Sequence, residues 1–181
     1  RSIREGITDK FPIVGEESFA AGNAPVVGDA PFWLVDPLDG TKEFVNRNGE
    51  FTVNIAMIDG GRPALGVIHV PVAKRTYWGA KIGVFAQVGN EDERLIQCRE
   101  APVDGLVAMV SRSHRTTEVD IFLADYTIAS ETSAGSSLKF CLIAEGSADI
   151  YPRLGRTMEW DTAAGHAILQ FAGGTVQDLD G

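Results

Sequence analysis

Apolar and β-branched residues predict a series of strands over the first half of the chain. Short apolar runs predict strands at residues 11–15 and 31–36, each followed by acidic residues and a turn. A β-rich run at residues 51–59 leads into the turn DGGRP, and further strands follow on both sides of Pro71. Residues 50–88 are therefore predicted to form an antiparallel meander.

Helical spacing of apolar residues begins near residue 119. One helix is predicted around residues 117–126, a second after the Ser/Gly turn at 133–137, and a third from about Thr162 to Phe171. Strands are predicted before the first helix, after the second helix, and after the third. The mixture of antiparallel strands and helices predicts a layered α/β fold in the broad sense.

Composition and charge restrict the possible partners. The chain has 181 residues and a formal net charge of −9, with no run of Lys or Arg. A nucleic-acid polymer is therefore not expected as a partner. No stretch approaches the ~18 apolar residues of a membrane span, so no transmembrane segment is expected. The two cysteines, Cys98 and Cys141, lack metal-binding spacing, which is typical of a reducing cytosol.

Acidic residues follow apolar or aromatic residues at three places, each next to a turn or a helix start. These places are GEES at 15–18, DPLDGT at 36–41, and Trp160-Asp161. On its own, DPLDGT is typical of a surface turn, because Asp, Pro and Gly are common turn residues. Carboxylates gathered on apolar supports repel one another, however, and a bound cation would stabilise such a cluster.

The carboxylate pattern indicates magnesium and phosphate chemistry. Ligand sets made only of oxygen suit Mg²⁺, and a pair of metal ions can hold both the attacking and the leaving oxygen of a phosphate. We expect Asp36 and Asp39 to face one cavity, with the Leu38 carbonyl turned inward. Thr41 supplies a hydroxyl that orients a water molecule.

The three motifs GEES, DPLDGT and WDTAAG, in this order, resemble those of the inositol monophosphatase-like superfamily of Mg²⁺-dependent, lithium-sensitive phosphomonoesterases. The segments SRSH, SAGSSLKF and YPRLGRTMEWDTAAG resemble its 3′(2′),5′-bisphosphate nucleotidase branch. The resemblance covers essentially the whole chain. It implies one phosphatase domain over residues 1–181, an alternating α/β/α/β/α layered sandwich without the N-terminal helices and C-terminal end of the pattern.

The resemblance also implies the roles of the site residues. Two or three Mg²⁺ ions would be bound by Glu16, Asp36, the Leu38 carbonyl, Asp39 and Asp161. Thr41, paired with Glu16, would position the attacking water, and Asp39 would belong to the same catalytic group. The backbone amides of Gly40 and Thr41 would contact the phosphate.

Further assignments concern the rest of the substrate. The resemblance places nucleotide contacts at Ser113, His114, Gly135, Ser136, Lys139 and Arg153. Lys139, one turn into a predicted helix, either pairs with a second phosphate or is a solvated helix lysine. His114 is either such a contact or an exposed loop residue.

The implied function is removal of the 3′-phosphate from 3′-phosphoadenosine 5′-phosphate, giving AMP and phosphate, within sulfur metabolism. One alternative is an inositol-1-monophosphatase or a fructose-1,6-bisphosphatase-like sugar phosphatase. Another is an inactive metal-binding fragment, because segments of the family pattern before GEES and after Asp178 are missing. We expect a monomer or homodimer in the cytoplasm, with peripheral membrane association as an alternative location.

Overall fold

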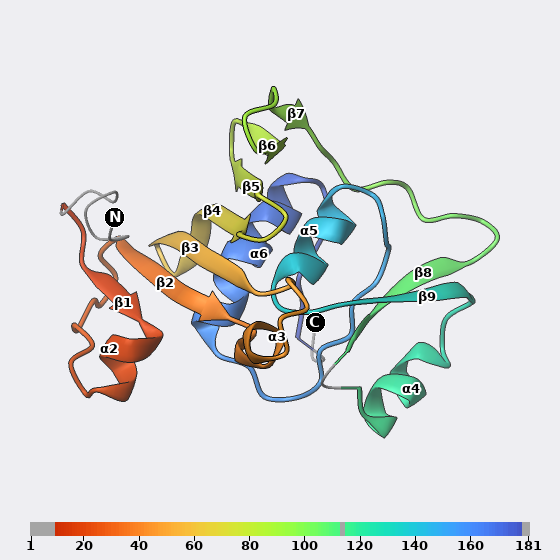
Figure 1. The fold of residues 1–181 in the computed structure, drawn as a ribbon, viewed down its shortest axis with the longest axis horizontal. Coiled ribbons are helices and arrows are strands. Elements are labelled where there is room, and N and C mark those ends of the chain that lie inside the picture. Colours follow the sequence, from red (N-terminus) through yellow and green to blue (C-terminus); the bar gives the residue numbers. More distant parts are fainter. Residues whose placement is uncertain (1–9, 113–114, 179–181) are drawn as a thin grey trace.

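A seven-stranded sheet dominates the computed structural model, which describes residues 10–112 and 115–178 (Figure 1). Its strands lie side by side in chain order, and only the first pair is parallel. The strands are β1 (Ile13–Gly15), β2 (Phe32–Asp39), β3 (Thr52–Asp59), β4 (Arg62–Val70), β5 (Arg75–Ala80), β6 (Gly83–Val88) and β7 (Arg94–Leu95). The predicted antiparallel meander over residues 50–88 is confirmed, including the break at Pro71.

One face of this sheet is buried against helix α6 (Glu159–Phe171), which crosses β3, β4 and β5 (Figure 1). Buried and half-buried residues alternate along β3 and β4, as expected for strands with one face in the core. Ile68 and Ile168 are fully buried at this contact. Apolar burial between sheet and helix therefore fixes where the first turn of α6 lies.

A second, two-stranded sheet lies on the other side of the helices. It pairs β8 (Leu106–Ser111) with β9 (Ile128–Ala134) in parallel, and α4 (Thr117–Leu123) connects them. Met109 of β8 packs into the main core with α5 (Leu138–Ala144) and α6, whereas Ala108 and Val110 pack against α4. The order sheet, helices, sheet, helix confirms the predicted layered α/β class.

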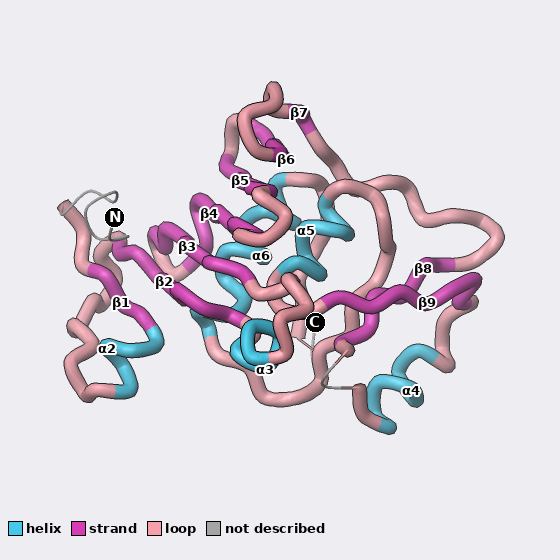
Figure 2. Tube along the Cα trace, viewed as in Figure 1, coloured by secondary structure: helices cyan, strands magenta, loops and turns pink. Residues whose placement is uncertain are grey.

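Some elements differ from the sequence prediction. The polar strand β9 was not predicted, because most of its residues are exposed and carry no apolar alternation. Residues 147–153, predicted as a strand, form only a bridge from Ile150 to Ala108, and Figure 2 draws this segment almost entirely as loop. The strand predicted after the last helix does not form over residues 174–178.

Short helices replace two of the predicted turns, and α6 starts earlier than predicted. Helix α2 (Glu16–Ala20) begins at the GEES motif, and α3 (Thr41–Val45) begins at the threonine of DPLDGT. Helix α6 begins at Glu159 rather than near Thr162, because the Asp161 carboxylate accepts a hydrogen bond from the Met158 amide and caps the first turn. Among the described residues, no helix is both long and apolar enough to cross a membrane.

Close packing of α6 on the sheet depends on glycine at position 66. A Cβ at this position of β4 would lie 2.2 Å from the Ala164 carbonyl oxygen. We expect Gly66→Ala to push α6 off the sheet and to lower the free energy of unfolding by about 1–3 kcal/mol, the range for overpacked cores. Denaturant unfolding measures this change.

The matched control is Gly155→Ala, since a Cβ at Gly155 meets nothing within 4 Å. It should leave the free energy of unfolding within about 0.5 kcal/mol of the parent. Equal stability of the two variants would contradict the packing argument.

Candidate metal centre

Three aspartates from two distant segments meet at one end of the large sheet. One carboxylate oxygen from each of Asp36, Asp39 and Asp161 lies within 4.8 Å of the others. Asp36 and Asp39 belong to β2, and Asp161 lies in the first turn of α6. Asp36 is 1% exposed, and the other two are half-buried. The arrangement is a compact set of oxygen donors at the edge of the core.

A β-bulge explains how two aspartates three positions apart face the same cavity. Residues three apart on a regular strand point to opposite faces. Here Asp36 pairs with Asn54 and Asp39 pairs with Thr52, so the ladder shifts by one residue between them. Because Asn54 and Thr52 are buried on one face of β3, their two partners share that face. The Asp-Pro-Leu-Asp spacing thus encodes the bulge.

Protein donors hold one oxygen of each carboxylate. Asp36 Oδ1 accepts the Leu38 amide at 2.9 Å, and Asp39 Oδ2 accepts the Ser137 amide at 2.6 Å. Asp161 Oδ2 accepts the Met158 amide at 3.0 Å and the Thr157 hydroxyl at 3.1 Å. Within residues 10–112 and 115–178, each of these carboxylates accepts hydrogen bonds at only one of its two oxygens. The second oxygen of each therefore remains available to a cation, the usual arrangement around metal ligands.

The electrostatics of the cluster favour a bound cation. The pKa of Asp36 is raised to about 7, mainly by burial and in smaller part by the charges of Asp39, Glu16 and Asp161, while the Leu38 hydrogen bond lowers it. Glu16 also has a raised pKa, first from desolvation and then from Glu17, Asp161 and Asp39. The residues present fit a metal ion with oxygen ligands. Its positive charge would offset the repulsion among the carboxylates and the cost of burying them, the two causes that raise the pKa values of Asp36 and Glu16.

Glu16 and Thr41 border this cluster without joining it. Glu16 is the first residue of α2 and is exposed, and Thr41 is the exposed first residue of α3. Among the hydrogen bonds of the described residues, none joins Thr41 to Glu16. Gly40, just before Thr41, has a φ of 86°, and a Cβ there would lie 2.0 Å from Ser136 Oγ. Glycine at position 40 therefore allows the DPLDGT turn to lie against the Ser136 turn.

Lys139 is buried, so the alternative of a solvated helix lysine is wrong. Its side chain is 4% exposed, and its ammonium donates to the Ser136 carbonyl at 2.6 Å and the Ala134 carbonyl at 3.3 Å. The ammonium also lies 5.2 Å from the centre of the Tyr151 ring. Burial lowers the pKa of Lys139 to about 8. These contacts bind Lys139 to the turn at 134–136.

Several predicted substrate contacts, among them Ser136, Lys139 and Arg153, line one small hollow next to the acids. A cavity of about 70 Å³ is lined by residues that include Asp39, Ser136, Lys139, Tyr151, Arg153 and Asp161. The Gly135 amide donates to Glu50 Oε2 at 2.7 Å, and Arg153 donates to the Arg156 carbonyl at 3.3 Å. Acidic and basic side chains thus meet at one small cavity. Ser113 and His114 lie outside the described residues.

Sequence reasoning missed the residues that support the acids. Ser137 and Asn54 are both almost fully buried and connect to Asp39 or to each other. Asn54 had a detectable signal, because it is a polar residue on the core-facing side of an otherwise apolar strand. Ser137 had none, since a serine before a helix is a common cap residue.

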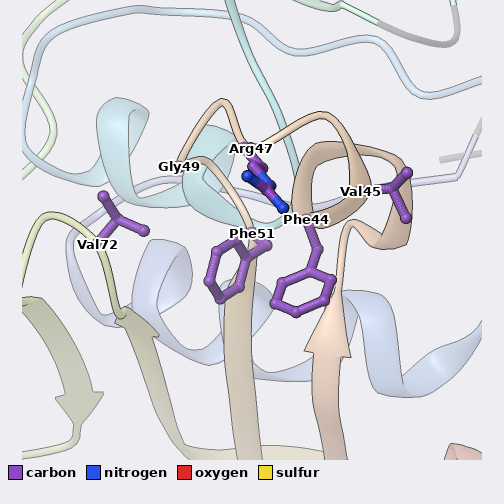
Figure 3. Close-up of a pocket in the computed structure, with 6 residues that line it drawn as sticks. All are labelled: Phe44, Val45, Arg47, Gly49, Phe51 and Val72. Atoms are coloured by element: carbon purple, nitrogen blue, oxygen red, sulfur yellow. The ribbon is translucent and has the colours of Figure 1, made fainter.

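A second hollow, of about 400 Å³, lies near α3 and has a different character (Figure 3). The rings of Phe44 and Phe51 meet edge to face with centroids 5.0 Å apart, and Figure 3 shows them together at this hollow. The lining residues are Phe44, Val45, Arg47, Gly49, Phe51 and Val72. With no acidic residue in its lining, this hollow offers no carboxylate to a metal.

Comparison with known families and curated proteins gives consistent matches. The model of the Inositol monophosphatase family matches residues 1–181. The chain is 46% identical to the protein named 3′(2′),5′-bisphosphate nucleotidase CysQ of Salmonella typhimurium, over 99% of this chain and 72% of that protein. It is 49% identical to the protein of the same name from Escherichia coli K12, over 83% of this chain and 60% of that protein. The chain thus spans 60% to 72% of the length of these relatives.

Solved structures show the same architecture. CysQ from Bacteroides thetaiotaomicron, described as a bacterial member of the inositol monophosphatase family, superposes with a TM-score of 0.76 at 41% identity. That match covers 91% of this chain and 67% of the other. The Thermotoga maritima IMPase superposes with a TM-score of 0.77 at 27% identity, covering 98% of this chain and 66% of the other.

The raised pKa of Asp36 predicts a pH-dependent stability. Between the ordinary value of 3.8 and about 7, the folded metal-free protein holds a proton at Asp36 that the unfolded chain has released. The free energy of unfolding in EDTA should therefore fall as the pH rises through this window. Asp36→Asn should reduce that slope, and millimolar Mg²⁺ should stabilise the parent at pH 8 but not the variant.

Thermal unfolding from pH 4 to pH 8, with and without Mg²⁺, measures both effects. Asp59→Asn is the control, because Asp59 is exposed at the end of β3. It should behave as the parent does. A slope that Asp36→Asn leaves unchanged would show that the buried carboxylate is not the titrating group.

Proposed function

The chain belongs to the inositol monophosphatase family, and we propose that it is a Mg²⁺-dependent phosphomonoesterase acting on 3′-phosphoadenosine 5′-phosphate. It hydrolyses the 3′-phosphate and releases AMP and inorganic phosphate. The observation that carries this proposal is the meeting of Asp36, Asp39 and Asp161 with one carboxylate oxygen each left unbound by protein donors. The names of the relatives at 46% and 49% identity support the choice of substrate.

Oxygen ligands for two or three Mg²⁺ ions would come from Glu16, Asp36, the Leu38 carbonyl, Asp39 and Asp161. Bound Mg²⁺ would neutralise phosphate charge and make water a stronger nucleophile. The choice of Mg²⁺ rests on the hard, all-oxygen donor set. The large negative charge of the chain is compatible with an anionic substrate only if cations mediate the contact.

Residues at the start of α2 and α3 would handle the water and the phosphate. The Thr41 hydroxyl would orient the attacking water, and Glu16 would accept its proton. The water oxygen forms the new bond to phosphorus, and the ribose 3′-oxygen leaves with the electron pair and takes up a proton. The Gly40 and Thr41 amides, at the start of α3, would donate hydrogen bonds to the phosphate oxygens.

The phosphate that is not cleaved would be held by cationic and polar groups around the cavity. Arg153 lines the cavity and is half-buried. Gly135, Ser136, Ser113 and His114 remain candidate nucleotide contacts. Lys139 donates two hydrogen bonds to backbone carbonyls, so its contribution to substrate binding would include support of the Ser136 turn.

A sugar phosphate substrate is the main competing assignment. The Thermotoga maritima IMPase has the same fold at 27% identity, whereas the relatives at 46% and 49% carry the nucleotidase name. The nucleotide is therefore the preferred substrate. A monomer or homodimer in the cytoplasm, formed from a single domain, completes the proposal.

Phosphate release from a substrate panel tests the proposal. The panel contains 3′-phosphoadenosine 5′-phosphate, inositol 1-phosphate and fructose 1,6-bisphosphate, each assayed with Mg²⁺ and with EDTA. We expect kcat/KM for the nucleotide to exceed the others by at least about tenfold, or ~1.4 kcal/mol of transition-state binding. Release should stop in EDTA. Faster release from inositol 1-phosphate would assign the chain to the sugar phosphatases, and no release from any substrate would favour an inactive fragment.

Arg153 should determine substrate choice rather than rate. If it binds the uncleaved phosphate, Arg153→Ala removes a charge-assisted hydrogen bond worth about 1.5–3 kcal/mol. KM for 3′-phosphoadenosine 5′-phosphate should rise by roughly tenfold or more, while KM for a 3′-monophosphate should change little. Steady-state kinetics on both substrates measures the difference.

Arg62→Ala is the control, since Arg62 is exposed at the start of β4. Both KM values should match those of the parent in this variant. Equal increases for the two substrates in Arg153→Ala would mean that Arg153 does not distinguish the second phosphate.

A further inference from the structure

We infer that Ser137 is a positioning residue that holds Asp39 and the first turn of α6 in the arrangement a cation requires. The inference rests on the proposed function, because it concerns the same carboxylates. It assigns no contact between Ser137 and the substrate. Its basis is the set of hydrogen bonds made by one buried hydroxyl and one amide.

Ser137 joins the two segments that carry the acids. Its amide donates to Asp39 Oδ2 at 2.6 Å, and its hydroxyl oxygen lies 2.7 Å from the same carboxylate oxygen. The hydroxyl oxygen also lies 2.7 Å from the Asp161 backbone carbonyl. Since a hydroxyl has one proton, it donates to one of these acceptors at a time. Ser137 thus contacts both Asp39 and Asp161 from a position that is 2% exposed.

The surrounding donors restrict the Asp39 carboxylate further. Thr52 Oγ1 donates to Asp39 Oδ2 at 3.2 Å, and Asn54 Nδ2 lies 3.4 Å from it. Ser136 Oγ donates to the Asp39 backbone carbonyl at 3.0 Å. With its donors gathered on one oxygen, the carboxylate cannot rotate without breaking several bonds. Its other oxygen is therefore held in place before any ligand arrives.

Asn54 restrains the Ser137 hydroxyl in turn. Its side-chain amide donates to the Ser137 hydroxyl oxygen at 2.8 Å, and the residue is 1% exposed. Its Oδ1 is buried and has no hydrogen-bond partner among the described residues. A buried acceptor without a partner lowers stability. An apolar residue would avoid that cost, but it would also lose the contacts of the amide with Ser137 and Asp39.

Asp161 receives a matching restraint from its own helix. Its carboxylate accepts bonds from Met158 and Thr157, while its carbonyl lies against the Ser137 hydroxyl. The backbone and side chain of Asp161 are thus fixed from opposite directions. The Ser137 hydroxyl is within hydrogen-bond distance of both Asp39 Oδ2 and the Asp161 carbonyl, whereas Thr52 reaches only Asp39. For this reason Ser137 rather than Thr52 is the positioning residue.

The test uses Ser137→Ala in the purified protein, with Mg²⁺ alone as the first probe. The unfolding temperature is followed as Mg²⁺ is added, which gives the Mg²⁺ affinity without any substrate. We expect the affinity to fall by roughly tenfold or more, the range for residues that orient metal ligands. With 3′-phosphoadenosine 5′-phosphate at a fixed Mg²⁺ level, kcat should fall by a similar factor while KM changes less than about threefold.

Two further variants provide controls. Ser147→Ala removes a hydroxyl that donates to Glu145 at 3.2 Å, away from the acids, and should keep the parent's Mg²⁺ affinity and kcat. Thr52→Val removes the 3.2 Å hydrogen bond from Thr52 to Asp39 but leaves both contacts of the Ser137 hydroxyl, with Asp39 and with Asp161. Its effect on Mg²⁺ affinity should therefore be smaller than that of Ser137→Ala. The unfolding temperature in EDTA reports any purely structural loss in each variant.

The outcomes separate this inference from the proposed function. Parent and Ser137→Ala with equal Mg²⁺ affinity and equal kcat would overturn the positioning role and leave the function standing. A parent that binds Mg²⁺ but does not cleave the nucleotide would overturn the proposed substrate, while a weakened Mg²⁺ titration in Ser137→Ala would still support the positioning role. A parent that binds no Mg²⁺ would overturn both.

Discussion

Mutual repulsion among Asp36, Asp39 and Asp161 is the constraint on which the rest of this structure depends. Three carboxylates with oxygens within 4.8 Å of one another repel one another in a partly buried site, and this repulsion needs compensation. The protein supplies part of it through backbone amides and hydroxyls directed at one oxygen of each group. The remaining charge is what would attract a cation to the cluster.

The layered fold delivers those donors to one place. The C-terminal part of β2 presents Asp36 and Asp39 at one end of the large sheet, and the neighbouring helical layer presents the first turn of α6 and the turn before α5. Glycines make this close approach possible. A Cβ at Gly135 would lie 2.5 Å from Glu43 Cγ, and one at Gly165 would lie 2.4 Å from the Phe140 ring. The site therefore depends on packing distances that larger residues would not permit.

Sequence patterns predicted the meander, the three helices α4, α5 and α6 of the second half and the acidic motifs, because these follow short-range rules. Alternation gave β3 to β6, and the Asp-Pro-Leu-Asp spacing marked the turn that the structure shows as a bulge. The polar strand β9 had no such pattern. Its place is determined by pairing with β8, which is a tertiary interaction.

The supporting residues of the site were harder to predict for the same reason. Lysine side chains are usually exposed, yet the Lys139 ammonium is buried and contacts the carbonyls of Ala134 and Ser136 and the Tyr151 ring. The start of α6 was placed too late because the Asp161 side chain caps the helix it belongs to. The hydroxyl of Ser137 finds its partners only in the folded protein. The separation of those partners along the chain determines when the cluster can form during folding: the Ser137 contacts span 98 residues to Asp39, 83 to Asn54 and 24 to Asp161. Closing loops of this length is entropically costly and slow relative to forming local helices and hairpins. The acids are thus brought together only when α5 and α6 dock on the sheet, because local folding of β2 alone cannot place Asp161 or Ser137 beside Asp39.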